Sequence, residues 1–261
     1  MIRIELALQL RNRRFAITTI GLVLLTVIVH VHIFVVDLSG MMEARGFNAL
    51  EAIVEIVFRF GLVIVVLVEA SYWFGRHFSE GTLQLFFFSG ATRANHWRAR
   101  VFVFVARTLM QSLLLYALAV ALFFAIWPAE PYPLGNDEIA VSEQIGRFSV
   151  AVLHSAITAM LWTACVFFST VVFRGRRFEA GTTAWLVFIL FNVAVRDAAL
   201  GLPSLFGGVF SVLFTSELIA AESCSRFFIA FALVLALAFA LFSAGTLMYR
   251  RISVSPQVGA T

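Results

Sequence analysis

The residues of this chain that could do chemistry are few, and two of them are charged residues inside apolar runs. Glu69 lies five residues before the end of one run, and Arg107 lies six residues past the start of the next. An unpaired charge in hydrocarbon costs several kcal/mol. We therefore expect Glu69 and Arg107, whose depths match, to form a salt bridge, and both a structural role and a role in substrate passage are open for it. Glu55 and Arg59 are spaced i, i+4 and are expected to pair along one helix.

The histidines and cysteines do not have the spacing of a metal site. His30 and His32 are two residues apart, so a helix points them in different directions. His154 and Cys165 are eleven residues apart, which separates them by three helical turns. The sequence therefore predicts no metal and no bound cofactor. His96 lies beside the connection between the second and third apolar runs and is expected to contact a protein partner.

The motifs of common enzymes are absent from the sequence. All 19 basic residues are arginine, so the chain cannot supply the lysine of an ATP-binding P-loop. It contains neither a G-x-S-x-G nor an H-E-x-x-H motif. The chain is therefore expected not to be an enzyme, and any ATP hydrolysis must come from another polypeptide.

The elements that position these residues are expected to be membrane-spanning helices. Of 261 residues, 61% are apolar and 13% are charged, far from the composition of soluble domains. Several apolar runs reach the roughly 20 residues that a helix needs to cross the bilayer. We predict an all-α polytopic membrane protein with a single transmembrane domain, residues 1–261. Its six spans are expected at residues 15–36, 52–74, 101–127, 148–173, 181–200 and 227–248.

The arginines predict the orientation of these spans. With the N-terminus inside, 13 arginines face the cytoplasm: Arg3, Arg11, Arg13, Arg14, Arg76, Arg93, Arg98, Arg100, Arg174, Arg176, Arg177, Arg250 and Arg251. Only Arg45, Arg147, Arg196 and Arg226 lie outside. The positive-inside rule then places both termini in the cytoplasm of a multi-pass protein of the bacterial inner membrane. The net charge of +4 thus reports topology and indicates no nucleic-acid partner.

Two apolar segments are too short or too polar to cross. Residues 1–14 have charged and amide side chains on one helical face, with arginines that can reach lipid headgroups, and we expect an interfacial helix there. Residues 201–214 are apolar but are interrupted by glycine and proline, and we expect a re-entrant hairpin at the outer surface.

The most informative segment is residues 75–100, between the second and third spans. Ser79 can cap a short apolar helix whose first turn carries Glu80. Gly90 is placed to end that helix, and Thr92 can cap the helix that continues into the third span. A helix this apolar and this short should lie on the membrane surface or against a protein partner.

This segment resembles the corresponding connection in permease subunits of ABC type-2 (ABC-2) transporters. The resemblance rests on Glu80, Gly81, Thr82, Leu83, Leu85, Ser89, Arg93 and Arg100. The chain departs from the family in having no proline after the leucine-rich helix and in having Arg100 where lysine is commoner. The haem-exporter branch has a similar segment and stays open as a subfamily.

The resemblance implies an exporter permease that is driven by a separate cytoplasmic ATPase dimer. In the family, the short helix docks on the ATPase, so Ser79, Glu80, Gly81, Thr82, Leu83, Leu85 and Arg93 are the implied coupling residues. ATP and Mg would be bound by that partner, and a second permease copy or a related permease would complete the pathway within the lipid. A secondary transporter or channel, and less so a membrane-embedded enzyme, are the alternatives. The substrate cannot be assigned from the sequence.

Overall fold

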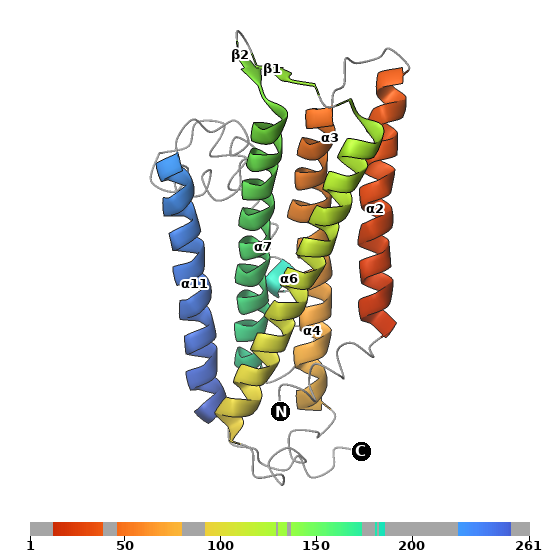
Figure 1. Ribbon diagram of the computed structural model, residues 1–261. Coiled ribbons are helices and arrows are strands. Elements are labelled where there is room, and N and C mark those ends of the chain that lie inside the picture. The colour runs from red at the N-terminus through yellow and green to blue at the C-terminus, as the bar shows by residue number, and fades with distance from the viewer. Residues whose placement is uncertain are drawn as a thin grey trace.

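The protein is an almost entirely helical bundle, as predicted. The computed structural model describes residues 13–38, 46–79, 92–128, 130–134, 137–173, 181, 183–185 and 224–251. The main elements are α2 (Arg13–Leu38), α3 (Gly46–Ile53), η1 (Val54–Leu62), α4 (Val63–Ser79), α6 (Arg93–Ile126), β1 (Tyr132–Leu134), β2 (Asp137–Ile139), α7 (Val141–Val172) and α11 (Cys224–Arg251). Figure 1 shows the long helices side by side, with the two strands at one end.

Four of the described helices are long and apolar enough to cross a membrane. They cover Arg13–Leu38, Asn95–Ile126, Val141–Val172 and Phe231–Arg251. These helices coincide with the first, third, fourth and sixth expected spans, and each extends beyond the expected apolar limits at one end or both. Their large hydrophobic side chains are exposed in rows, for example Ile17, Leu24 and Ile28 on α2. Such rows suit a lipid environment, so the chain is a helical membrane protein.

The second expected span is built from three helical pieces in series. α3, η1 and α4 follow one another without a break, and η1 is a π-helix of nine residues. The residues at both ends of η1, Ile53 and Val63, keep right-handed helical backbone angles. The column therefore runs from Gly46 to Ser79, which is longer than the expected residues 52–74. π-Helical geometry inside an α-helix is rare and gives no clear pattern in the sequence.

α7 is the central helix of the bundle, and α11 packs parallel to it. Ala159, Val166 and Phe167 of α7 are fully buried. Phe167 contacts Phe242 of α11 edge-on, and an added Cβ at Gly245 would lie 3.5 Å from the Phe167 ring. The later halves of both helices thus lie together, and both helices run in the same direction (Figure 1).

The basic end of the bundle is the end where α2 and α6 begin and where α4, α7 and α11 end (Figure 1). Trp97 of α6 lies between helices at this end. Its ring stacks on Tyr249 of α11 at a centroid distance of 4.4 Å, and Phe74 of α4 packs edge-on against Phe167 at the same distance. This aromatic cluster joins α4, α6, α7 and α11 at one level.

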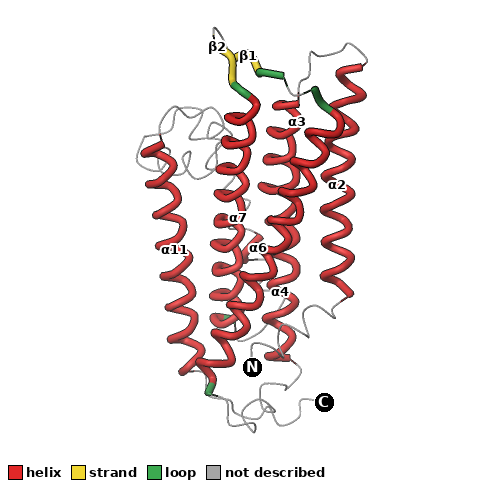
Figure 2. Tube along the Cα trace, viewed as in Figure 1, coloured by secondary structure: helices red, strands yellow, loops and turns green. Residues whose placement is uncertain are grey.

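A two-stranded hairpin at the opposite end of the bundle was not predicted. β1 and β2 pair antiparallel, with Tyr132 opposite Ile139 (Figure 2). The buried side chain of Gln144 in α7 donates hydrogen bonds to the backbone oxygens of Glu130 and Ile139, both at 3.0 Å. The sequence does carry a signal for the hairpin, because Gly-Asn at positions 135 and 136 is a dipeptide typical of the turns that join such strands.

Several predicted elements lie outside the described residues. These are the interfacial helix up to residue 12, the segment 80–91 and the outer hairpin at 201–214. Of the fifth expected span, only residues 181 and 183–185 are described. Ala184 is buried there, and an added Cβ at Gly181 would lie 3.4 Å from the Ser71 hydroxyl of α4. This short helical piece therefore packs against α4.

Candidate functional site

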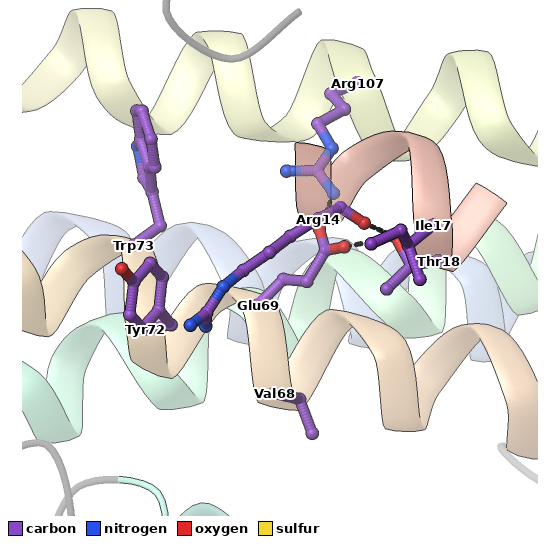
Figure 3. Close-up of a pocket in the computed structure, with 8 residues that line it drawn as sticks. All are labelled: Arg14, Ile17, Thr18, Val68, Glu69, Tyr72, Trp73 and Arg107. Carbon is purple, nitrogen blue, oxygen red and sulfur yellow. Dashed lines mark hydrogen bonds and ion pairs between the residues drawn. The ribbon is translucent and has the colours of Figure 1, made fainter. Parts of the chain in front are cut away.

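The structure brings Glu69 of α4 and Arg107 of α6 together as an ion pair inside the bundle. Nη2 of Arg107 contacts Oε2 of Glu69, and the two residues are only 4% and 7% exposed. Figure 3 shows the guanidinium directed at the carboxylate from the opposite helix. The expectation drawn from their matching depths therefore agrees with the geometry.

Helix α2 supplies the third side of this site. The hydroxyl of Thr18 donates to Oε1 of Glu69, the carboxylate oxygen that Arg107 leaves available (Figure 3). The Arg107 guanidinium also lies over the Phe15 ring, 4.3 Å from its centroid. Ring faces attract cations, so α2 stabilises both members of the pair, one through a hydroxyl and one through an aromatic ring.

A second arginine closes the site toward the basic end. Arg14 lies over the Tyr72 ring of α4, with its guanidinium carbon 3.6 Å from the ring centroid. Figure 3 shows the Arg14 side chain extending past Glu69 toward Tyr72. Between these side chains is a cavity of about 120 Å³. Its walls are formed by Arg14, Ile17, Thr18, Val68, Glu69, Tyr72, Trp73 and Arg107.

The same face of α6 makes a further polar contact with α2. The side-chain amide of Gln111 donates to Oγ1 of Thr19 at 2.8 Å. Arg107 and Gln111 are four residues apart, so they lie one above the other on the helix. Two side-chain hydrogen bonds, Thr18 to Glu69 and Gln111 to Thr19, thus join α2 to α4 and to α6.

This arrangement is suited to holding helices in register. A buried carboxylate and a buried guanidinium compensate each other, and separating them would leave a charge in a medium of low dielectric. Among the described residues, no three histidine, cysteine, aspartate or glutamate side chains gather as metal ligands would. The site therefore resists sliding of α4 against α6.

The predicted coupling residues lie between Glu69 and Arg107 along the chain. Ser79 is the last residue of α4, and Arg93 is the first residue of α6. Thr92 caps α6 as predicted, because its side chain accepts a hydrogen bond from the Asn95 amide at 3.3 Å. Glu80, Gly81, Thr82, Leu83 and Leu85 lie outside the described residues.

The helix before the coupling segment is longer than predicted, whereas α6 begins directly after Thr92 as predicted. Residues 75–79 continue α4, and residues 93–100 belong to α6, so only residues 80–91 separate the two helices. Ser79 stands at a helix end where the prediction placed it at a helix start. The stretch after Phe74 is polar, yet it continues a helix that is already formed, which costs less than starting a new one.

The structure also describes three other predicted features, one ion pair and two sets of histidines. Glu55 and Arg59 pair along η1, with Oε2 and Nη1 2.8 Å apart. His30 is buried, with Nδ1 3.1 Å from the Thr26 backbone oxygen, and His32 is exposed, so the two histidines do not converge. His96 is only 1% exposed, which corrects the expectation that its side chain contacts a protein partner. The first turns of α6 direct His96 into the bundle.

Arg14, Thr18 and Tyr72 were not predicted as members of the site. Their contribution depends on which face α2 turns toward α4. The even distribution of apolar residues around α2 gives no indication of that rotation. The one available signal is the i, i+4 spacing of Arg14 and Thr18, which places both on one face near Glu69 in depth.

Comparison with known proteins identifies no family for this chain. The chain matches no protein-family model, and no curated protein matches it.

Proposed function

We propose that this chain is the membrane-spanning permease subunit of an ATP-binding-cassette exporter of the ABC-2 type. It would move its substrate across the bacterial inner membrane when a separate cytoplasmic ATPase dimer, which binds ATP and Mg, closes on residues 80–91. A second copy of the chain, or a related permease, would form the other half of the pathway.

The observation that carries this proposal is the position of the Glu69–Arg107 ion pair relative to the coupling segment. Glu69 lies ten residues before Ser79, and Arg107 lies fourteen residues after Arg93. At 1.5 Å per residue, these intervals correspond to about 15 Å and about 21 Å of helix. A force applied to residues 80–91 would therefore reach two helices that are fixed to each other and to α2. A partner that binds two positions of this unit unequally would shift the balance between them.

The distribution of arginines supports the cytoplasmic location of the coupling segment. In the described part of the chain, eight arginines gather at the basic end: Arg13, Arg14, Arg76, Arg93, Arg98, Arg100, Arg250 and Arg251 (Figure 1). At the opposite end, the same part of the chain has only Arg147 and Arg226. This asymmetry is the one expected when the basic end faces the cytoplasm.

The path of the chain supports six spans. α7 ends at the basic end, whereas α11 runs parallel to it and begins at the opposite end (Figure 1). The connection between them therefore joins opposite ends of the bundle, which requires an odd number of crossings. One crossing at residues 181–200, added to the four long helices and the α3–η1–α4 column, gives six.

The proposal is tested by capturing the partner with charge-reversal variants. An affinity-tagged chain should retain a P-loop ATPase in mild detergent. Glu80→Arg should reach the membrane in normal amounts and lose the ATPase, because a cation replaces the acidic residue at the start of the docking segment. Arg251→Glu reverses a charge at the same end of the bundle and should retain it.

Two results would overturn the proposal. One is equal ATPase capture by the wild type and Glu80→Arg. The other is substrate transport by the chain alone in proteoliposomes with an ion gradient and no ATP, which would indicate a secondary transporter.

A further inference from the structure

A groove between α6 and α11 opens on the outer surface of the bundle, away from the Glu69–Arg107 site. It has a volume of about 580 Å³. Its walls are apolar, and the rings of Phe102 and Phe239 are 59% and 75% exposed. Two arginines lie on its rim at the basic end, Arg98 of α6 and Arg250 of α11, and both are exposed.

The length of the groove matches one leaflet of a bilayer. Along α11 it extends from Phe239 to Arg250, eleven residues apart, which is about 16 Å of helix. Half of a hydrocarbon core of roughly 30 Å is about 15 Å. The guanidinium groups therefore lie at headgroup level when Phe239 lies near the bilayer midplane.

Two aromatic residues near the arginines of the groove support this depth. Trp97 lines the groove and stacks on Tyr249, the residue that precedes Arg250. Tryptophan and tyrosine concentrate at the membrane–water interface, where one part of the ring system is apolar and another polar. The polar rim and the interfacial aromatics thus lie at the same level.

We propose that this groove binds an anionic phospholipid of the leaflet at the basic end. The headgroup phosphate would lie between Arg98 and Arg250, and an acyl chain would lie along Val101, Phe102 and Phe239. Basic pockets between membrane helices on the cytoplasmic side recognise anionic headgroups in this way. The proposal needs the basic end to lie at a membrane surface and does not depend on an ATPase partner.

Charge favours a lipid over a second copy of the chain as the occupant. None of the residues that line the groove is acidic, so its two cations need an anion from outside. Among the described residues of the basic half, the acidic side chain is Glu69, which is buried against Arg107. The described part of a second copy therefore offers no exposed carboxylate at the level of Arg98 and Arg250. An anionic lipid of the same leaflet has its phosphate at that level.

Native mass spectrometry of the purified protein, released from nanodiscs, tests the proposal. The nanodiscs contain equal amounts of phosphatidylglycerol and phosphatidylcholine. The wild type should retain phosphatidylglycerol preferentially. The double variant Arg98→Gln/Arg250→Gln should lower that retention by about thirtyfold, given the contribution of each of the two basic residues near a charged surface. Arg13→Gln/Arg251→Gln removes the same charge at the same end, outside the groove, and should retain the lipid.

A second variant tests the acyl-chain part of the groove without a change of charge. Ser243 lines the groove, so Ser243→Trp should fill it and reduce phosphatidylglycerol retention as well. An excess of inorganic phosphate should leave retention unchanged if the acyl chain holds the lipid. Equal retention by the wild type and both groove variants would overturn the proposal, and so would an equal loss in the Arg13/Arg251 control, which would indicate nonspecific surface charge.

Discussion

At the scale of single residues, the buried ion pair is the feature that most constrains the molecule. Glu69 and Arg107 each need the other because neither can be solvated where it lies. Thr18 and Phe15 then fix the orientation of the two groups from a third helix. The pair therefore holds three helices at one depth.

Replacing either member of the pair alone should destabilise the protein more than replacing both. Glu69→Ala or Arg107→Ala leaves one buried charge without its partner, which costs about 3 kcal/mol. The double variant Glu69→Leu/Arg107→Leu removes both charges, so its loss should be well below the sum of the single losses. Denaturant titration of the purified proteins in mixed micelles measures the three free energies.

If both single alanine variants insert, unfold and transport like the wild type, the pair does not constrain the helices. Glu143→Ala is a suitable control, because Glu143 pairs with Arg147 at 2.7 Å on the exposed start of α7. That variant should change stability by less than about 1 kcal/mol.

The pair could be predicted from the sequence, but the rest of the site could not. The positions of Glu69 and Arg107 in adjacent apolar runs determine their depth, and hydrocarbon makes an unpaired charge expensive, so a partner at equal depth is required. Arg14 and Tyr72 interact only because α2 turns one particular face toward α4. That rotation is decided by packing between helices that are distant in sequence.

At the scale of the elements, Gly46 allows α3 to approach the end of α6 closely. An added Cβ at Gly46 would lie 2.5 Å from Cε2 of Phe123 and 3.0 Å from Cβ of Trp127. Phe123 and Trp127 are buried, so neither can move aside freely. Small residues let membrane helices approach in this way.

Gly46→Ala should therefore destabilise the bundle, whereas Gly21→Ala should not. Overpacking of a filled site costs about 1–3 kcal/mol. At Gly21 of α2, an added Cβ would meet nothing within 4 Å, and alanine is the better helix former. Thermal unfolding of the two purified variants measures the difference. Equal melting temperatures would show that α3 and α6 can separate at this point without cost.

Element boundaries were predicted less well than the elements themselves. Apolar runs mark where a helix lies in hydrocarbon, but α6 and α7 continue for several polar residues beyond it. The π-helical turns of η1 arise within an ordinary apolar run. The Gln144 contacts that hold the hairpin join residues on both sides of a loop, and residue spacing alone does not reveal them.

At the scale of the whole molecule, the described arginines are separated along the bundle, with most of them at one end. Thirteen arginines were assigned to one side from the sequence, and eight of them lie in the described residues and gather at the basic end. Counting charges can predict which residues share an end of the bundle because it needs only the order of the spans. The contacts of the bundle with a partner are a property of the assembly, and charge counting along one chain does not predict them.

The most direct measurement of the central claim is site-specific photocrosslinking in living cells from the segment between α4 and α6. A photoreactive phenylalanine analogue replaces Phe86, and the tagged chain is purified after irradiation. The same analogue at Phe102, on the apolar face of α6, is the control and should crosslink to lipid. If residues 80–91 dock on the ATPase, position 86 should crosslink to a protein with a P-loop. Crosslinks from position 86 to lipid alone, or to a protein on the outer side of the membrane, would contradict it.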